Sequence, residues 1–177
     1  MKYSEELLAR ARRIKLLLLD VDGVLTDGRV ILGPDGMELK AFNSQDGFGL
    51  KRLGENGVAC GVITGRGSVA LQRRAKELGF RHLVENTEDK LPAFEAIIKK
   101  EGLTAEDCAY MGDDWPDLPL LCRVGLALAP ANATPEVKRR AHFVTERAGG
   151  AGAAREACEL ILTAQGRLEI LLARYDR

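Results

Sequence analysis

The sequence has little of the features that mark several specialised classes of protein. It has no excess of charge, because 26 lysine and arginine residues balance 26 aspartate and glutamate residues, so it offers no broad basic field for nucleic acid. No apolar run is long enough to span a bilayer. Residues 1–13 are charged and amphipathic, unlike a signal peptide. We therefore expect a cytoplasmic protein with neither a nucleic-acid nor a membrane partner.

Cysteine and histidine are also scarce. The cysteines are far apart and form no CxxC pair, and His82 and His142 lie in strand-like contexts, so neither a zinc site nor a disulfide framework is indicated. We expect the cysteines to be buried as small apolar residues and the imidazoles to be satisfied within the fold. The four cysteines are Cys60, Cys108, Cys122 and Cys158.

What the sequence does contain is an alternation of strand-like and helix-like segments. At 177 residues and 46% hydrophobic content, residues 1–177 suit a single well-buried domain. The alternation predicts an α/β fold with a doubly wound, mainly parallel, Rossmann-like sheet. Strands are expected at 14–19, 58–63, 82–84, 108–111, 125–129 and 142–144. Helices are expected at 47–56, 68–78, 90–100, 117–123, 134–141 and 152–163.

The first apolar run ends abruptly in two carboxylates. Residues 14–19 lead into Asp20 and Asp22, which indicates a buried central strand with acidic side chains at its C-terminal end, where open α/β sheets bind ligands. If the extended backbone continues, the two side chains point to the same side. A calcium loop is excluded because Leu25 and Ile31 occupy positions that require Gly and Glu. A plain polar turn remains the alternative for this short pattern taken alone.

Other polar side chains follow strands or open helices further along the chain. Thr64 follows the strand at 58–63, Lys90 opens a helix, and the run Gly112 to Asp117 carries three more carboxylates. In a doubly wound sheet these positions meet in one crevice. Clustered carboxylates repel one another unless a cation lies between them, and hard oxygen ligands suit Mg²⁺. A lysine and a hydroxyl beside that ion form a phosphate clamp.

The order of these motifs, DxDG, a strand ending in Thr, Lys and GDDxxD, resembles the haloacid dehalogenase-like superfamily of phosphohydrolases over essentially the whole chain. The resemblance implies that Asp20 is the nucleophile that forms an aspartyl-phosphate and that Asp22 is the general acid and base. It also implies that Thr64 and Lys90 hold phosphate oxygens.

The same resemblance implies a set of magnesium ligands. These are Asp20, the backbone carbonyl of Asp22, and Asp113, with Asp114 and Asp117 further from the ion. The metal then screens the attacking carboxylate from the phosphate dianion.

A β-hairpin is predicted at about 28–42, on either side of a turn at Gly33-Pro34-Asp35-Gly36. An isolated hairpin is marginally stable, so a neighbouring subunit is the expected contact. The intervals between the motifs leave room for this hairpin and ordinary α/β elements but for no cap domain. A capless phosphohydrolase acts on a large substrate or borrows a lid from another subunit.

Longer segments resemble one capless branch, the 3-deoxy-D-manno-octulosonate 8-phosphate phosphatase family. These segments are Asp20–Gly28, Asn43–Gly49, Ile63–Arg66, Gly112–Pro119 and Arg147–Glu156. The resemblance implies a sugar phosphate substrate from the synthesis of lipopolysaccharide precursors, a homotetramer with hairpins at its interfaces, and a C-terminal tail, about 167–177, that closes over a neighbour's site.

Substrate-binding candidates each have an alternative interpretation. Beside Gly65, Arg66 is expected to pair with the substrate carboxylate, or else to pair within the protein. Asn43, Gln45 and Asp46 are candidates for the sugar site, although Asp46 is equally suited to cap the following helix. Arg147 is expected in a loop over the site, and the glycines after it are equally consistent with tight packing.

Two rival functions remain open. One is hydrolysis of a nine-carbon keto-deoxy sugar acid 9-phosphate, against which Arg66 argues if that position varies with substrate. The other is a non-catalytic oligomerisation module, against which the intact set of Asp20, Asp22, Lys90 and Asp113 argues.

Overall fold

The fold is built around a six-stranded sheet. The computed structural model of the protein describes residues 3–34 and 36–176. The strands follow the order β5-β4-β1-β6-β7-β8, and each pairing is parallel. The predicted doubly wound, Rossmann-like α/β fold is therefore confirmed. The strands are β1 (Leu16–Leu19), β4 (Ala59–Ile63), β5 (His82–Val84), β6 (Cys108–Met111), β7 (Leu126–Ala129) and β8 (Phe143–Val144).

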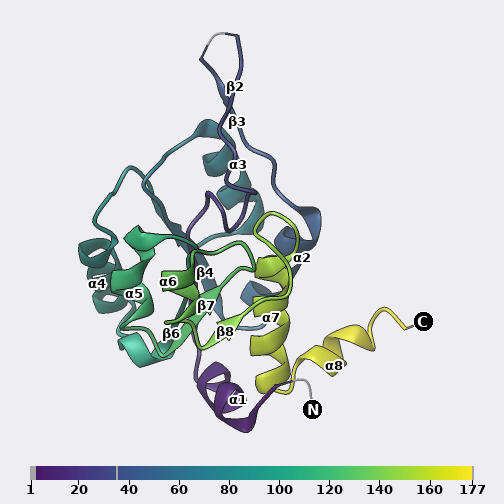
Figure 1. Cartoon of the computed structure of the whole chain (residues 1–177). Coiled ribbons are helices and arrows are strands. Elements are labelled where there is room, and N and C mark those ends of the chain that lie inside the picture. Colours follow the sequence, from purple (N-terminus) through teal and green to yellow (C-terminus); the bar gives the residue numbers. More distant parts are fainter. Residues whose placement is uncertain (1–2, 35, 177) are drawn as a thin grey trace.

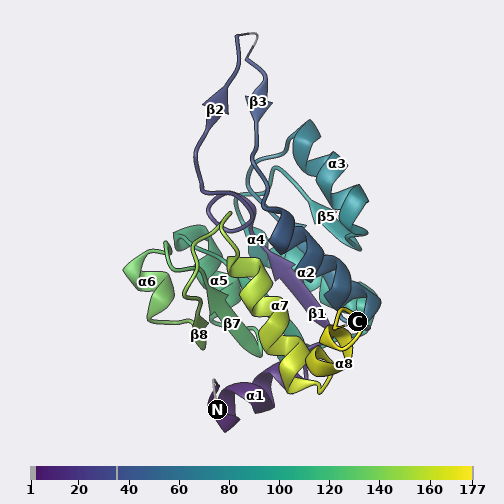
Figure 2. The same ribbon diagram turned by 90° about the vertical axis from the view of Figure 1, so that its right-hand side faces the viewer.

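Helices cover both faces of this sheet (Figure 1). They are α1 (Glu5–Arg12), α2 (Ser44–Glu55), α3 (Val69–Leu78), α4 (Lys90–Glu101), α5 (Leu118–Leu121), α6 (Pro135–Lys138), α7 (Ala153–Ala164) and α8 (Leu168–Leu172), with 3₁₀ turns at Ala105–Asp107 and Trp115–Asp117. Successive strand residues point to opposite faces. Leu17 and Leu19 therefore pack with α1, α2 and α7, whereas Leu16 and Leu18 pack with α4, α5 and α6. Figure 2 shows α2 and α7 side by side on the first face.

The strand order places a crevice at the end of β1. From β1 the chain adds β4 and then β5 on one side, and then returns to add β6, β7 and β8 on the other. Where the connections from two neighbouring strands run to opposite sides of the sheet, a crevice opens between them at the carboxyl ends of the strands. The residues that follow β1 and β6 meet there.

The backbone turns as soon as β1 ends. The Val21 carbonyl accepts hydrogen bonds from Leu25 N at 2.9 Å and Thr26 N at 3.0 Å. The condition that the extended backbone continues is therefore not met at Asp22, which lies in the turn, whereas Asp20 N still donates to the Met111 carbonyl of β6 at 2.9 Å.

A glycine-rich segment packs against this turn. Gly149 N donates to Asn132 Oδ1 at 2.6 Å, and Asn132 Nδ2 donates in turn to the Gly23 carbonyl at 2.9 Å. A Cβ atom on Gly149 would lie 1.9 Å from that same carbonyl oxygen. Tight packing, the alternative given for these glycines, thus accounts for Gly149, and Asn132 is a contributor that sequence patterns did not indicate.

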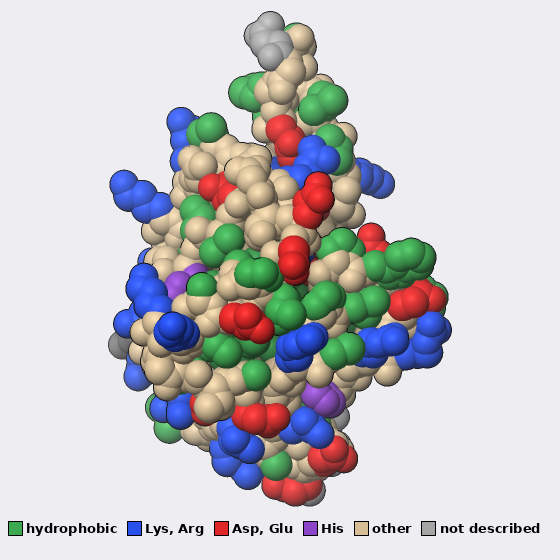
Figure 3. Space-filling model, turned by 90° about the vertical axis from the view of Figure 1, so that its left-hand side faces the viewer, with side chains coloured by type: hydrophobic (Ala, Val, Ile, Leu, Met, Phe, Trp, Pro, Cys, Tyr) green, Lys and Arg blue, Asp and Glu red, His purple; other side chains and the backbone are tan. Residues whose placement is uncertain are grey.

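A β-hairpin projects from the end of the molecule opposite the two termini (Figure 1). Its strands, β2 (Ile31–Leu32) and β3 (Glu38–Leu39), are shorter than the predicted hairpin, and Asp35 of the predicted turn lies outside the described residues. Figure 3 shows hydrophobic side chains along this projection. Five apolar side chains of the hairpin are between 44% and 67% exposed, namely Val30, Ile31, Leu32, Met37 and Leu39. In the described part of the chain, no cap domain interrupts the fold.

Several local predictions need correction. The second helix begins at Ser44 rather than residue 47, because Asn43 Oδ1 accepts from the amides of the first turn. The helix expected at 134–141 is only Pro135–Lys138. Cys122 is exposed, unlike the other three cysteines.

Of the expectations for the imidazoles and the tail, only that of a satisfied His142 is confirmed, and closure of the tail over a neighbour's site stays a prediction. His142 Nδ1 accepts from Ala127 N at 2.9 Å. His82 Nε2 lies 3.1 Å from Glu101 Oε1, yet it is buried and forms no hydrogen bond with the described residues. The tail forms α8, after which the Tyr175 ring meets Phe48 edge to face at 6.0 Å. No helix among the described residues is both long and apolar enough to span a membrane.

Replacing Gly149 by alanine tests the packing of the turn after β1. The new methyl group meets backbone, which cannot move as a side chain does, so we expect Gly149→Ala to lower the free energy of unfolding by about 2 kcal/mol or more. Gly54→Ala is the matched control, since nothing lies within 4 Å of its Cβ and alanine favours the helix by about 0.5–1 kcal/mol. Urea unfolding measures both, and equal stabilities would contradict the packing.

Candidate active site

The four sequence motifs meet in one cleft of about 580 Å³ at the C-terminal edge of the sheet. The cleft contains the side chains that follow β1, β4 and β6 and the lysine that opens α4. Its lining residues are Asp20, Asp22, Gly28, Thr64, Gly65, Arg66, Thr87, Glu88, Lys90, Asp113, Asp114 and Pro116. The expectation that distant motifs converge is met for Asp20, Asp22, Thr64, Gly65, Arg66, Lys90, Asp113 and Asp114.

Lys90 is the buried cation of this cleft. It is the first residue of α4, and its side chain is only 2% exposed. Its Nζ lies 2.6 Å from Asp117 Oδ1 and 3.0 Å from Asp20 Oδ2. A buried ammonium group needs such partners, so the lysine is fixed in place by the two carboxylates.

Asp117 has both oxygens engaged. Oδ1 accepts from Lys90 and from the Tyr110 hydroxyl at 2.7 Å, while Oδ2 accepts from the backbone amides of Asp113 at 2.9 Å and Asp114 at 3.2 Å. This carboxylate therefore shapes the loop after β6 and positions Lys90 from below the cleft. Tyr110 was not indicated by the sequence, because it reads there as an ordinary apolar residue of a buried strand.

Asp113 and Asp20, the other two carboxylates of the cluster, have too little positive charge near them to offset their own. Burial, followed by the charges of Asp117 and Asp20, raises the pKa of Asp113 to about 7. Burial and Asp117 raise the pKa of Asp20 to about 6 even though Lys90 opposes the change. Burial lowers the pKa of Lys90, but the attraction of Asp117 and Asp20 raises it more, so the lysine stays charged. One lysine does not neutralise the cluster.

The cluster fits a hard divalent cation. One oxygen from each of Asp20, Asp113 and Asp117 lies within 4.8 Å of the others. Asp113 Oδ1 is buried and has no hydrogen-bond partner in the described part of the chain. Asp117 accepts four hydrogen bonds, whereas Asp20 has two partners and Asp113 Oδ1 has none, so Asp20 and Asp113 are the carboxylates with room for a cation such as Mg²⁺, which takes oxygen ligands. Asp114 Oδ1 instead accepts from Trp115 N at 2.8 Å.

Asp22 and Arg66 belong to a separate charge network at the rim of the cleft. Asp22 Oδ1 receives Lys40 Nζ at 2.5 Å, and Arg66 Nη2 lies 2.9 Å from Glu38 Oε2. Arg66 thus pairs within the protein, as its alternative interpretation held, while its side chain remains 49% exposed beside the cleft. Thr64, buried at the end of β4, accepts from Arg66 N through its hydroxyl at 3.3 Å.

The other substrate-binding candidates lie elsewhere, where α2 meets α7. Asn43 Nδ2 donates to the Gly150 carbonyl at 3.3 Å, and an Arg147 guanidinium nitrogen donates to Gln45 Oε1 at 2.8 Å. Neither Asn43, Gln45 nor Arg147 lines the cleft of this chain. Their role in substrate binding stays a prediction.

Asp46 does not cap the helix that follows it, so that alternative is wrong. Its Oδ1 accepts from Arg155 N at 2.7 Å and its Oδ2 from Gly152 N at 3.2 Å, so it caps the start of α7 instead. Burial raises the pKa of this carboxyl, and the backbone hydrogen bonds oppose the change. Its role at a sugar site likewise stays a prediction.

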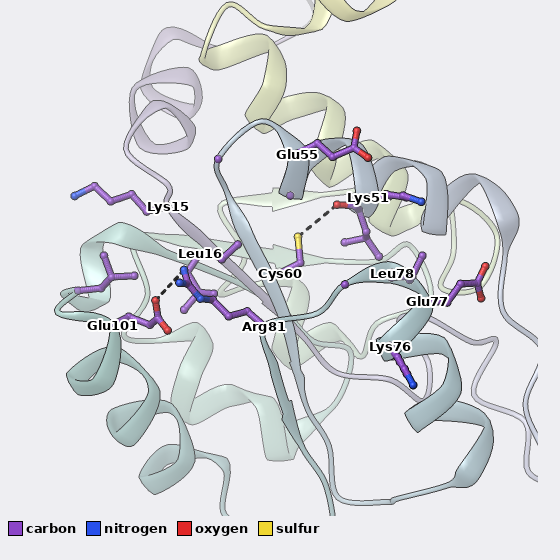
Figure 4. A pocket seen from close by; sticks show the side chains of 16 residues that line it. Lys15, Leu16, Lys51, Glu55, Cys60, Lys76, Glu77, Leu78, Arg81 and Glu101 are labelled. Atoms are coloured by element: carbon purple, nitrogen blue, oxygen red, sulfur yellow. Dashed lines mark hydrogen bonds and ion pairs between the residues drawn. The ribbon is translucent and has the colours of Figure 1, made fainter.

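A larger groove, of about 830 Å³, lies at the opposite edge of the sheet, near the starts of β1 and β4 (Figure 4). Its charged side chains have mixed signs, and Arg81 is paired with Glu101 at 3.2 Å. Cys60 Sγ is directed at the Leu50 carbonyl, 3.7 Å away. None of the motif carboxylates lines this groove, so its size does not make it the catalytic centre.

The chain is similar to known phosphatases over nearly its whole length. Residues 81–156 match the family model of the haloacid dehalogenase-like hydrolases. The chain is 44% identical to the 3-deoxy-D-manno-octulosonate 8-phosphate phosphatase of Escherichia coli K12, over 94% of this chain and 88% of the relative.

Solved structures extend this similarity to three dimensions. A probable YrbI family phosphatase from Pseudomonas syringae has a TM-score of 0.96 and 49% identity, covering 98% of this chain and 99% of that one. The 3-deoxy-D-manno-octulosonate 8-phosphate phosphatase of Moraxella catarrhalis, solved with magnesium, phosphate and KDO, has a TM-score of 0.96 and 41% identity, covering 98% and 100%.

The raised pKa values of Asp20 and Asp113 predict how Mg²⁺ binding depends on pH. Both carboxyls must lose their protons to bind the ion, so the increase in Tm caused by Mg²⁺ should be large near pH 8 and small near about pH 5.5. Without the ion, both pKa values exceed the ordinary 3.8, so stability should fall as pH rises from about 4 to about 7.

Thermal melts with and without Mg²⁺ across this pH range measure both effects. Asp113→Asn is the control, and it should abolish most of the response to Mg²⁺. An increase in Tm that is independent of pH would contradict the assignment of these carboxylates as ligands.

Proposed function

The chain belongs to the 3-deoxy-D-manno-octulosonate 8-phosphate phosphatase family, and from this premise we propose the roles of its residues. The protein is a magnesium-dependent phosphoric monoester hydrolase that releases phosphate from 3-deoxy-D-manno-octulosonate 8-phosphate, a step in the synthesis of lipopolysaccharide precursors. The observation that carries the mechanism is the cluster of Asp20, Asp113 and Lys90 in one cleft.

Asp20 is the proposed nucleophile. Its Oδ1 accepts from Val21 N at 2.7 Å and its Oδ2 lies 3.0 Å from Lys90 Nζ, so the carboxylate is held rigidly at the floor of the cleft. Attack on phosphorus forms an aspartyl-phosphate while the ester oxygen leaves with the electron pair of the broken bond. Lys90 and Thr64, which line the same cleft, are the proposed partners of the phosphate oxygens during this transfer.

Asp22 is the proposed general acid and base. It gives a proton to the departing ester oxygen and later takes one from the water that attacks the aspartyl-phosphate, which returns Asp20 to its carboxylate form. Both carboxylates line the same cleft. When bound by Asp20, the Asp22 carbonyl and Asp113, Mg²⁺ supplies positive charge that offsets the repulsion between nucleophile and phosphate.

The rim of the cleft suits an acidic sugar. Arg66 is half-exposed and its guanidinium fork is suited to a carboxylate, so it is the proposed partner of the substrate's acid group. Gly65 beside it lets the substrate approach the backbone. Asn43, Gln45, Asp46 and Arg147 are retained as sugar-site candidates that act from another subunit or after a rearrangement.

The exposed apolar hairpin supports a homotetramer as the proposed assembly. Side chains such as Leu32, which is 67% exposed, are costly to leave in water. Residues 1–177 are proposed to act as one domain, in the cytoplasm, with the tail from 167 onward closing a neighbouring site. Light scattering tests the assembly, and a monomer at working concentration would contradict it.

Phosphate release tests the function directly. With Mg²⁺ present, we expect strong preference for the eight-carbon 8-phosphate over the nine-carbon 9-phosphate and simple sugar phosphates. Asp20→Asn should remove turnover by a factor of about 10⁴ or more while the melting temperature in the absence of metal stays the same or rises. Equal rates on all substrates would remove the specific assignment, and release of no phosphate from any would favour the oligomerisation module.

A further inference from the structure

The two oxygens of the Asp22 carboxylate have different surroundings. Oδ1 lies 2.5 Å from Lys40 Nζ and 3.5 Å from the Thr26 hydroxyl. Oδ2 is buried and receives no hydrogen bond from the part of the chain that the structure describes, and Arg66 Nε lies 3.9 Å from it. The carboxylate is therefore held through one oxygen, and the described part of the chain supplies no hydrogen-bond donor to the other.

Lys40 is built into this position. It follows β3 at the base of the projecting hairpin, where lysine side chains normally extend into water, yet its side chain is only 2% exposed. Besides Asp22, it contacts Glu38 Oε1 at 2.9 Å. Burying an ammonium group is costly without such partners, so the two carboxylates keep this side chain inside.

Glu38 and Arg66 complete a balanced network. Hydrogen bonds from Lys40 and Arg66 hold the pKa of Glu38 below its usual range, so Glu38 stays charged. Two carboxylates, Asp22 and Glu38, thus face two cations, Lys40 and Arg66. Without Lys40, Asp22 would lie near the charged Glu38, and no cation would donate a hydrogen bond to Asp22.

From this arrangement we propose that Lys40 is a positioning residue that holds Asp22 by Oδ1 and thereby turns Oδ2 toward the ester oxygen of the substrate. The proposal rests on the proposed function of Asp22 as acid and base. Lys40 itself touches no reacting atom. The ester oxygen takes the proton from Asp22 Oδ2 as the phosphorus–oxygen bond breaks, and the attacking water later returns a proton to the same oxygen.

A double-mutant cycle isolates this role. We expect Lys40→Met to lower kcat for the sugar phosphate by roughly 10- to 100-fold, a part of the usual effect of acid–base catalysis, while KM changes by less than about threefold. In an Asp22→Asn background, Lys40→Met should cause no further loss, because the group that it positions is already disabled. Lys40→Arg should restore part of kcat, since it keeps a cation at this place.

An aryl phosphate separates the two chemical steps. p-Nitrophenolate leaves without a proton, so the first-turnover burst of Lys40→Met should match that of the unaltered protein. The later steady rate should fall, because the attacking water still needs a base. Lys99→Met, an exposed lysine on α4, is the matched control and should alter neither phase.

Each outcome decides the question. Three results would overturn the proposal. The first is a double variant whose loss of kcat is the product of the two single losses. The others are a raised KM with unchanged kcat, and a burst that falls as much as the steady rate. If Lys40→Met fails to fold, Lys40→Gln takes its place, with melting curves as the check. Failure of the unaltered protein to release phosphate from either substrate would overturn the proposed function and this proposal together, whereas an active protein with an inert Lys40→Met change would overturn the proposal alone.

Discussion

An excess of negative charge around one buried lysine is the constraint on which the rest of the site depends. Asp20 and Asp117 both contact Lys90, and Asp113 adds a third carboxylate within the same cluster. The fold stabilises the charge of Asp117 with four hydrogen-bond donors, namely Lys90, the Tyr110 hydroxyl and the backbone amides of Asp113 and Asp114. Asp20 and Asp113 have no comparable compensation, and their raised pKa values show the cost. A cation relieves that cost, which links metal binding to the stability of the site.

The charge network at the hairpin base has the opposite character. Asp22 and Glu38 are matched within the chain by Lys40 and Arg66. Asp20 and Asp22, the two proposed catalytic carboxylates, are only two residues apart, yet Asp20 shares its lysine with Asp117 whereas Asp22 is paired with Lys40. This difference suits their proposed roles, because a nucleophile next to a phosphate dianion needs added positive charge whereas an acid and base needs a fixed orientation. The hairpin thus brings Lys40 and Glu38 to the edge of the cleft as well as presenting apolar side chains at its sides.

Sequence reasoning located the side chains whose position depends on local pattern. Asp20, Thr64 and Asp113 directly follow buried strands, and the parallel sheet brings all strand ends to one edge. It missed residues whose partners are distant in the chain: Lys40 contacts Asp22 across 18 positions, and Asn132 contacts Gly23 across 109. For the same reason the alternative that Asp46 caps the helix following it was wrong, since its partners lie at the start of α7. Asp20 and Asp22 line the same cleft although the extended backbone ends after Asp20, because a turn closed on the Val21 carbonyl also leaves Asp22 at the cleft.

The central claim is that Asp20 takes the phosphoryl group and that Asp22 helps to release it. Acid quenching of Asp22→Asn during its first turnover with Mg²⁺ and p-nitrophenyl phosphate, followed by peptide mass spectrometry, tests it most directly. The account requires the mass of one phosphoryl group on the peptide that contains Asp20, and its loss when Asp20 is also changed to asparagine. A burst of p-nitrophenolate with no phosphorylated peptide, or a phosphoryl group on another residue, would contradict it.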